Sequence, residues 1–290
     1  MKLSYDWEDY ECIDASSSEK LERWKDIILR RPDPQAMWKS DKKSKMWNDA
    51  HAVYLRSPKG GGEWKYNKKF KKEWTIDYKG LTFKVSPTGF KHTGLFPEQA
   101  VNWDYIMDSI SNANKEVKVL NLFAYTGGAT MAASKAGAKE VVHVDASKGM
   151  VDWAKENMRL SNLENNKIRF IVDDCLKFVE REKRRKNSYD VIIMDPPSYG
   201  RGPNGEIWKF EDSIYNLIYA CMDILSDEPL FMLINSYTTG ISNTVLENIL
   251  KTTLLKKYPN YIVEAGEVGL PITKDGLVLP CGIYGLFKKD

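Results

Sequence analysis

The sequence predicts an α/β protein in which a largely parallel sheet, covered by helices on both faces, follows a smaller β-rich region. From about Val117 onward, short apolar runs alternate with amphipathic segments, which is the pattern of repeated βαβ units. Before that point, short stretches rich in tryptophan are broken by Gly, Pro and Lys clusters, which is typical of small β-domains. We therefore expect a β-rich domain over residues 1–95 and an α/β domain over residues 96–290.

The N-terminal region is marked by its tryptophans and by an uneven distribution of charge. Six of the nine tryptophans fall within residues 1–95. Residues 1–26 carry eight acids against four bases, whereas residues 59–79 carry seven lysines against three acids. The segments Arg30–Pro34 and Pro58–Gly62 are rich in Pro or Gly and predict turns between strands.

The α/β region contains five apolar runs that are short enough for buried strands. They are Val117–Phe123, Glu140–Asp145, Ile168–Asp173, Asp190–Met194 and Leu230–Asn235. Between them, Ser147 is expected to cap a helix with an apolar face, and another helix is expected around residues 245–254. Segments 261–269 and 282–288 have no helix between them, so we expect a closing antiparallel hairpin.

Composition narrows the class of protein. The formal charge of +3 is too small to indicate a nucleic-acid partner by itself. No apolar run approaches the roughly 20 residues of a membrane helix, and the first residues lack the layout of a signal peptide, so we expect a cytoplasmic protein. The four cysteines and three histidines are scattered, with no C-x-x-C pair, so no metal site is expected.

A glycine-containing loop follows the first predicted strand. The segment Asn121–Thr130 (NLFAYTGGAT) leaves an apolar run, bends at Gly127 and Gly128 and enters a helix over residues 129–138. Such a turn brings backbone N–H groups and a helix N-terminus close to a ligand. The segment lacks the G-x-G-x-x-G of a dinucleotide site. The alternative is a glycine pair that serves only helix–sheet packing.

Acidic residues end the next three predicted strands. Asp145 lies eighteen residues past the first of the two glycines, a spacing typical of the acid that binds ribose hydroxyls in nucleoside-binding α/β folds. Asp173 and Asp174 end the third strand, and Asp195 ends the fourth. Because the carboxyl ends of parallel strands meet at one edge, we expect these acids to face one ligand. Each acid alone is equally explained as a solvated strand end or a helix cap.

The segment Asp195-Pro-Pro-Ser-Tyr is expected to leave its strand stiffly, because two prolines fix the backbone and donate no hydrogen bonds. The Asp195 carboxylate and nearby carbonyls would then accept hydrogen bonds from a planar amino or ring group, and Tyr199 would stack on it. The alternative is a rigid turn with no ligand.

Together these segments resemble class I S-adenosylmethionine (SAM)-dependent methyltransferases, close to the bacterial large-subunit (23S) ribosomal-RNA methyltransferase-like group. The resemblance spans most of the chain. It is carried by residues 121–130, 144–146 (VDA), 173–175 (DDC), 195–208 (DPPSYGRGPNGEIW) and 91–103 (KHTGLFPEQAVNW). It implies a Rossmann-like seven-stranded sheet in the order 3-2-1-4-5-7-6, whose reversed last strand agrees with the expected hairpin.

The resemblance also implies SAM as cofactor and assigns residues to it. The implied cofactor-binding residues are Phe96, Gln99, Tyr125, Thr126, Gly127, Gly128, Asp145, Ala146, Asp174 and Cys175. Within this set, Asp145 would hold the ribose and Asp174 the adenine amino group. The residues expected to receive the methyl acceptor are Asp195, Pro196 and Tyr199. The alternative for residues 91–103 is a turn and helix start that pack the two domains together.

The chemistry favours a nitrogen as methyl acceptor. Methyl transfer from a sulfonium needs orientation, exclusion of water and a free lone pair, and no metal. Cytosine-5 methylation needs a cysteine thiolate as well. Related cytosine-5 enzymes place it after the fifth strand or beside Asp-Pro-Pro, and residues 195–198 and 230–237 contain no cysteine. Amino-group methyltransferases have their aromatic residue directly after the second proline, where this chain has Ser198.

Three basic groups predict contacts with RNA, which makes the N-terminal domain a candidate for RNA recognition. They lie within residues 39–45, 65–72 and 181–186, and aromatic residues interleave the second. Arg201 and Lys209 would also guide the RNA backbone. The alternative for these groups is a set of solvated faces. Alternatives for the function are methylation of a small molecule or a protein, cytosine-5 methylation of RNA, and cofactor binding without catalysis.

Overall fold

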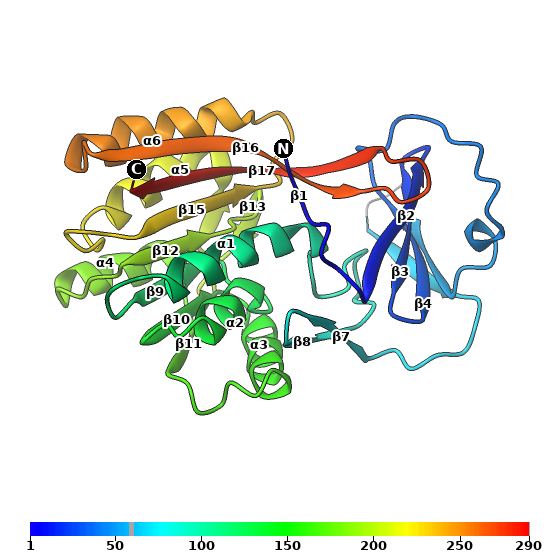
Figure 1. The fold of residues 1–290 in the computed structure, drawn as a ribbon, viewed down its shortest axis with the longest axis horizontal. Coiled ribbons are helices and arrows are strands. Elements are labelled where there is room, and N and C mark those ends of the chain that lie inside the picture. The colour runs from blue at the N-terminus through cyan, green and yellow to red at the C-terminus, as the bar shows by residue number, and fades with distance from the viewer. Residues whose placement is uncertain (58–60, 290) are drawn as a thin grey trace. The chain divides into compact units, whose positions relative to one another are not determined.

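The computed structural model describes residues 1–57 and 61–289, which form two compact units (Figure 1). The first, here called the sheet–helix unit, comprises Met1, Asn102–Val268 and Gly282–Asp290. The second, the β-rich unit, comprises Lys2–Val101 and Gly269–Cys281. The β-rich unit thus includes a segment from near the C-terminus, which the expected division between residues 95 and 96 leaves out.

One large sheet carries the sheet–helix unit. Among the described residues it has eight strands in the order β1-β16-β17-β15-β12-β9-β10-β11. Their bounds are β1 (Lys2–Leu3), β9 (Lys118–Leu122), β10 (Glu140–Asp145), β11 (Ile168–Val172), β12 (Val191–Met194), β15 (Phe231–Ser236), β16 (Tyr261–Pro271) and β17 (Val278–Lys289). The five runs predicted as strands are confirmed to within one or two residues at each end.

The pairing of these strands matches the expected arrangement. Strands β11, β10, β9, β12 and β15 pair in parallel, and β17 runs antiparallel to β15. Without β1, the strands of this sheet, numbered along the chain, follow the order 3-2-1-4-5-7-6. The short strand β1 was not expected, and β16 and β17 extend beyond the predicted hairpin ends.

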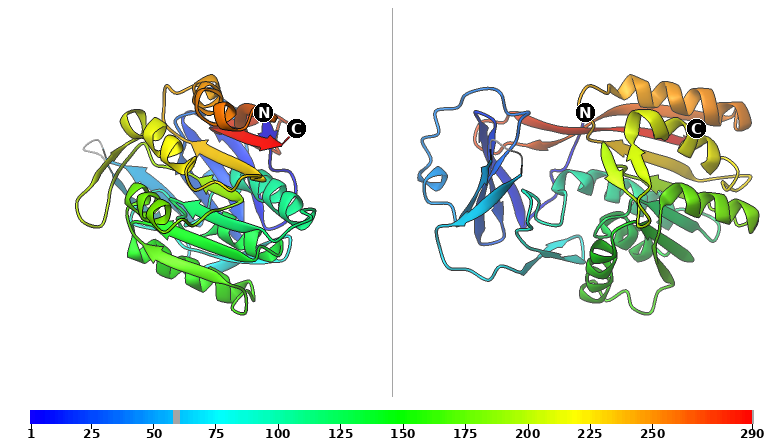
Figure 2. Two further views of the ribbon diagram at one scale, coloured as in Figure 1. Left: turned by 90° about the vertical axis from the view of Figure 1, so that its left-hand side faces the viewer. Right: turned by 180° about the vertical axis from the view of Figure 1, so that it is seen from behind.

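Helices cover both faces of the sheet (Figures 1 and 2). They are α1 (Ala100–Ser111), α2 (Gly128–Lys135), α3 (Lys148–Leu160), α4 (Cys175–Arg184), α5 (Phe210–Cys221) and α6 (Asn243–Lys257). As expected, Ser147 caps α3, because its hydroxyl accepts a hydrogen bond from the Met150 N–H. Within residues 1–57 and 61–289, no helix combines the length and apolar character that a membrane span requires.

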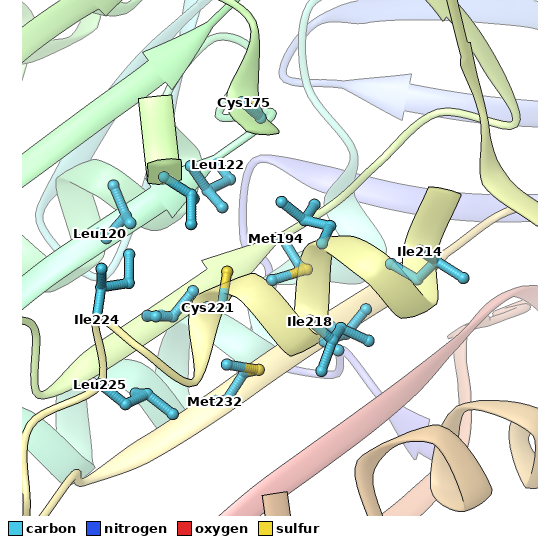
Figure 3. Close-up of a cluster of buried hydrophobic side chains, with 14 of the residues drawn as sticks. Leu120, Leu122, Cys175, Met194, Ile214, Ile218, Cys221, Ile224, Leu225 and Met232 are labelled. Atoms are coloured by element: carbon cyan, nitrogen blue, oxygen red, sulfur yellow. The ribbon is translucent and has the colours of Figure 1, made fainter. Parts of the chain in front are cut away.

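A large hydrophobic cluster lies between the sheet and helices α4, α5 and α6 (Figure 3). Ile214, Ile218 and Cys221 of α5 face Met194 of β12 and Met232 of β15. Full burial of a side chain of this size contributes roughly 1.5–3 kcal/mol. The cluster therefore holds the central strands, and with them the strand ends, in fixed positions.

The β-rich unit contains a second sheet and a hairpin. Among its described residues, five strands pair in the order β2-β3-β4-β5-β6, and β7 pairs with β8. Their bounds are β2 (Tyr10–Ser16), β3 (Glu19–Trp24), β4 (Ile27–Pro32), β5 (Ala52–Arg56), β6 (Gly62–Tyr66), β7 (Trp74–Tyr78) and β8 (Leu81–Val85). Two short 3₁₀ helices, η1 (Lys45–Trp47) and η2 (Pro97–Gln99), interrupt the connections.

The two predicted turns have different outcomes. The turn expected at Arg30–Pro34 is wrong in its first part, because β4 continues through Pro32 and the chain turns only from Asp33. Pro is compatible with the end of a strand, where its missing N–H breaks no ladder. Of the turn expected at Pro58–Gly62, residues 58–60 lie outside the described residues and Gly62 begins β6.

A buried ion pair joins β3 to β4 in the β-rich unit. Arg31 donates from Nε and Nη2 to the two carboxylate oxygens of Glu22, at 2.6 and 2.7 Å, and the Tyr10 hydroxyl donates to Glu22 at 2.8 Å. Burial alone would raise the pKa of Glu22. The charges of Arg31 and Lys20 and the hydrogen bonds outweigh burial and lower it to about 2.

Replacing Glu22 by Gln should lower the free energy of unfolding at pH 7 by roughly 3 kcal/mol, because the Arg31 guanidinium stays buried without a countercharge. The folded-state pKa of Glu22 lies below its unfolded value of about 4.3. The contribution of the Glu22 charge to the free energy of unfolding is therefore complete above about pH 4.3. It is lost as the pH falls towards 2. Urea unfolding followed by tryptophan fluorescence should show the difference from wild type narrowing below about pH 4.3.

Glu63→Gln is the matched control, since Glu63 is an exposed acid on β6. It should change the unfolding free energy by less than about 0.5 kcal/mol. A difference between wild type and Glu22→Gln that stayed constant from pH 7 to pH 3 would contradict the charge-based explanation.

Candidate functional site

The carboxyl ends of four neighbouring strands lie level with one another. Leu122, the last residue of β9, pairs with Val144 of β10 and Met194 of β12. Asp145 pairs in turn with Val172, the last residue of β11. The residues that follow at this edge are the loop 123–127, Ala146, Asp173, Asp174 and Asp195. The structure thus brings together the strand-end acids that the sequence predicted to meet.

Asp145 connects two of these strand ends. Its Oδ2 accepts a hydrogen bond from the Tyr125 N–H at 2.9 Å, and its Oδ1 accepts one from the Ser147 N–H at 2.8 Å. Burial raises the pKa of Asp145, while these two hydrogen bonds act in the opposite direction. Each carboxylate oxygen keeps a second acceptor position. The carboxylate is therefore fixed in orientation and can still accept hydrogen bonds from a ligand.

The structure gives a different reason for glycine at each position of the pair. Gly127 has a φ of +87°, a conformation that glycine adopts without strain, and Tyr125, two residues before it, has a φ of +51°. Gly128 begins α2, and a Cβ there would meet the Trp103 ring of α1 at 2.5 Å. Gly128 is therefore needed for close packing against helix α1, whereas the alternative expected packing of the glycine pair against the sheet.

A buried polar network under the loop escaped the sequence analysis. The Asn121 amide donates to the Thr130 hydroxyl at 3.0 Å, and that hydroxyl lies 2.9 Å from Nδ1 of His143. Burial lowers the pKa of His143 to about 3, so the ring is neutral at pH 7. The Asn157 amide of α3 donates to the Thr126 carbonyl at 2.8 Å. These contacts fix α2 and the loop from below.

A signal for this network was present in the sequence. Asn121 and His143 are polar residues within apolar runs, and the register pairs them directly on β9 and β10. Two polar side chains at matching positions of neighbouring buried strands need partners, since an unpaired buried polar group is costly. The register between the two strands cannot be taken from the sequence, so the pairing of Asn121 with His143 could not be predicted.

Asp174 and Cys175 begin α4. Oδ1 of Asp174 accepts a hydrogen bond from the Lys177 N–H at 2.9 Å, so the helix-cap alternative holds for that oxygen. Oδ2 makes no hydrogen bond with another residue in the described part of the chain. The Cys175 thiol is buried, and its sulfur accepts a hydrogen bond from the Phe123 N–H at 3.3 Å. Any contact of Cys175 with a ligand would therefore be made by its backbone atoms and not by its thiol.

The carbonyls after Asp195 are not equivalent. The Pro197 carbonyl accepts a hydrogen bond from the Trp208 indole at 2.7 Å, and the Ser198 carbonyl accepts one from the Phe210 N–H at 3.0 Å. The carbonyls of Pro197 and Ser198, which the sequence expected to face a ligand, therefore already accept hydrogen bonds within the chain. Asp195 itself is half-buried at the end of the fully buried strand β12.

The segment after Ser198 is an ordered hairpin, formed by β13 (Tyr199–Arg201) and β14 (Ile207–Lys209). Tyr199 is 52% exposed, and its ring is accessible for stacking. The Trp208 ring lies 4.8 Å from the Phe123 ring, and Glu206 forms an ion pair with Lys177 of α4. The hairpin is thus attached to the loop after β9 and to the first turn of α4.

Other predicted residues belong to the β-rich unit. Phe96 precedes η2 and lies 5.3 Å from the His92 ring, and Gln99 is buried at the end of η2. Their predicted contacts with a cofactor remain predictions. In the described part of the chain, no group of three or more His, Cys, Asp or Glu side chains is arranged to hold a metal ion.

Comparison with known sequences gives a family match. A family model described as S-adenosylmethionine-dependent methyltransferase matches residues 36–217. Ribosomal RNA large subunit methyltransferase K/L of Shewanella frigidimarina is 36% identical over 169 residues, covering 58% of this chain and 23% of that protein. The protein of the same name from Pseudoalteromonas translucida is 37% identical over 150 residues, covering 51% and 20%. The chain thus spans only about a fifth of the length of these curated relatives.

Solved structures agree. The SAM-dependent methyltransferase from Agrobacterium tumefaciens is 34% identical, with a TM-score of 0.94 over 100% of this chain and 93% of that chain. A putative methyltransferase complexed with SAH is 17% identical, with a TM-score of 0.71 over 97% of this chain and 76% of that chain. At that level of identity, the second structure supports the fold alone.

Replacing Gly128 by Ala should destabilise the protein by about 1–3 kcal/mol, because the added methyl group must displace the Trp103 ring. Helix propensity alone would predict the opposite, because alanine favours a helix more than glycine does. Gly149→Ala on α3 is the matched control, since its Cβ would meet only the Ser147 hydroxyl at 3.9 Å. It should leave stability unchanged or raise it.

Thermal unfolding of both variants measures the difference. Trp103→Leu combined with Gly128→Ala should recover part of the loss, because the two residues are in contact and their effects are not additive. Equal effects of the two glycine replacements would contradict a packing role for Gly128.

Proposed function

Because this chain belongs to the S-adenosylmethionine-dependent methyltransferase family, we propose that it transfers a methyl group from SAM to a nitrogen of a base in ribosomal RNA. The observation that carries the proposal is the meeting of Asp145, Asp174 and Asp195 at one edge of the sheet. Open α/β sheets bind ligands at this edge. Relatives named as ribosomal RNA large subunit methyltransferases support the choice of substrate. The expected cytoplasmic location belongs to the same proposal.

The hydrogen-bond acceptors at the strand ends suit SAM. The fixed carboxylate of Asp145 can accept hydrogen bonds from ribose hydroxyls, and Oδ2 of Asp174 can accept one from the adenine amino group. The loop through Tyr125 and Gly127 leads into the N-terminus of α2, which suits the methionine part. When bound, SAM supplies an electrophilic methyl group on a sulfonium. The family resemblance also assigns Phe96 and Gln99 of the β-rich unit to the cofactor, and both stay predictions.

The acceptor side of the proposal lies after β12. The Asp195 carboxylate and the Pro196 carbonyl would hold the target base through its N–H groups, and Tyr199 would stack on it. The segment is held in place, because the Ser198 hydroxyl lies 3.0 Å from the Thr238 hydroxyl and the Pro197 carbonyl is bound by Trp208. A fixed segment can orient a lone pair towards the methyl group, which is the main requirement of this displacement.

The burial of the thiols supports nitrogen rather than cytosine carbon-5 as the acceptor. A cysteine nucleophile must form a thiolate, and exposure and a lowered pKa assist this. Burial raises the pKa of Cys12, Cys175, Cys221 and Cys281 above the ordinary value.

A basic segment of the β-rich unit supports RNA as the substrate. Residues 65–72 carry five exposed lysines, namely Lys65, Lys68, Lys69, Lys71 and Lys72. The Phe70 ring lies 5.9 Å from both Tyr66 and Trp74, so the aromatic residues hold the segment together. The lysines would then meet phosphates, although Lys68 already pairs with Asp49 at 2.8 Å.

Methylation of a small molecule or a protein is the alternative function. The incubation of purified protein with isotopically labelled SAM and ribosomal RNA, followed by nucleoside mass spectrometry, decides between them. We expect a methylated base with the label on nitrogen. A label on 5-methylcytidine would overturn the assignment of the atom. Turnover with small molecules or ribosomal proteins but not with RNA would overturn the assignment of the substrate.

Asp145→Ala should weaken SAM binding by about 1–3 kcal/mol, because the ribose hydroxyls lose an acceptor in a half-buried site. It should also lower the thermal stability, since the N–H groups of Tyr125 and Ser147 lose their partner. Isothermal titration calorimetry measures the affinity. Asp152→Ala, an exposed acid on α3, is the control and should change neither quantity. An unchanged affinity in Asp145→Ala would remove Asp145 from the cofactor site.

Asp195→Ala should reduce turnover by at least about 100-fold while SAM affinity changes little, because positioning an acceptor acts on the reaction and not on cofactor binding. Asp195→Asn keeps an acceptor oxygen and should retain more activity than Asp195→Ala. Asp212→Ala on α5 is the control for a nearby exposed acid. An equal loss of cofactor affinity and turnover would place Asp195 in the cofactor site.

A further inference from the structure

The loop between β8 and η2 in the β-rich unit exposes an aromatic side chain on a tightly bonded backbone. Phe90 is 67% exposed. The Trp64 indole of β6 donates to the Thr88 and Phe90 carbonyls at 2.9 and 3.0 Å. The Ser86 N–H donates to the Thr93 carbonyl at 3.0 Å and closes the loop. The Phe90 ring therefore stands in solvent on a backbone that other bonds hold in place.

Within the loop, Thr88 provides further bonds. Its N–H and its hydroxyl both donate to the His92 carbonyl, at 3.1 and 3.0 Å, and its hydroxyl accepts a hydrogen bond from the Phe90 N–H at 3.3 Å. A rigid aromatic platform loses little conformational entropy when it stacks on a ligand. An exposed ring on a flexible loop would lose more.

The next residue, Lys91, interacts with the charges of several basic side chains. Its carbonyl accepts a hydrogen bond from Arg31 at 2.9 Å, and its side chain is half-buried. Burial lowers the pKa of Lys91, and the charges of Lys20, Arg31 and Arg56 lower it further, while the charge of Asp33 acts in the opposite direction. A half-buried ammonium among other cations is unfavourable unless an anion offsets it.

The acids near this group are already used by other cations. Glu22 binds Arg31, and Asp33 pairs with Lys20 at 3.3 Å. In contrast, neither Lys91 nor Arg56 forms an ion pair with an acid within residues 1–57 and 61–289. These two cations, one half-buried and one exposed, are available for an anionic ligand.

We propose that the loop Ser86–Thr93 binds a single-stranded segment of RNA, in which Phe90 stacks on an unpaired base while Lys91 and Arg56 bind the neighbouring phosphate. An exposed aromatic side chain beside unpaired basic residues is the combination by which proteins bind single-stranded nucleic acid. Trp64 connects this loop to β6, which continues into the basic segment at residues 65–72. The inference rests on the proposed function and adds a defined RNA-binding element to it.

The test measures binding of a fluorescein-labelled 12-nucleotide single-stranded RNA by anisotropy over a range of salt concentrations. Phe90→Ala should weaken binding about tenfold with an unchanged salt dependence, since stacking carries no charge. Lys91→Met should reduce the slope of log K against log salt by about 0.7, the value for one phosphate contact on a single strand. Affinity for a 12-base-pair RNA duplex should not depend on Phe90, because its bases are already stacked.

Two variants in the same unit are matched controls. Tyr5→Ala removes an aromatic side chain that is 68% exposed, and Lys25→Met removes a lysine that pairs with Asp9 and Asp77. Neither should change RNA binding. All four variants should keep the wild-type thermal stability and SAM affinity, which shows that the fold and the cofactor site are intact.

The outcomes separate this inference from the proposed function. If wild type binds RNA but Phe90→Ala and Lys91→Met bind it like their controls, the inference is wrong and the function stands. A loss of SAM affinity in these variants, with RNA binding unchanged, would assign the loop to the cofactor and overturn the inference. If wild type binds neither RNA, both proposals fail together.

Discussion

The parallel register of β9 with its two neighbours is the constraint on which the candidate site depends. Leu122 is level with Val144 and Met194, so the next residues of three strands emerge at the same edge. A shift of one residue in either pairing would turn the alternating side chains of that strand to the opposite face. The buried cluster against α4, α5 and α6 opposes such a shift, because it requires Leu120 and Leu122 to face those helices.

Buried polar groups also fix the arrangement of strands and helices, in addition to the apolar cluster. The network of Asn121, Thr130 and His143 joins two strands and α2 on the face opposite to that cluster. Hydrogen bonds depend on direction more strictly than apolar contacts, so a satisfied buried network selects one arrangement of helix and sheet. In the β-rich unit, the Glu22–Arg31 pair has the same role between β3 and β4.

The sequence predicted the parts of the fold whose signal is local. Apolar runs locate the strands after residue 117, and the acids at their ends identify the edge that matters. It missed the pairing of Cys12 with Ile272 and the ordered hairpin of β13 and β14, because neither has a local pattern that distinguishes it from a loop. The same limit applies to the candidate site. The sequence identified Asp145 and Asp174 as residues of interest. Only the structure shows that Asp174 caps α4 and that the Trp208 indole donates to the Pro197 carbonyl.

The composition of the β-rich unit has a consequence for synthesis on the ribosome. Its final segment, Gly269–Cys281, includes Lys274, whose ammonium lies 3.0 Å from the fully buried carboxylate of Asp14. The Thr273 N–H also donates to the Cys12 carbonyl at 3.0 Å. At about 5–20 residues per second, roughly 250 residues take tens of seconds to emerge. During that time Asp14 has no Lys274 beside it, so the N-terminal strands cannot reach their final stability as they are made, and this unit is completed only after residues 269–281 have emerged.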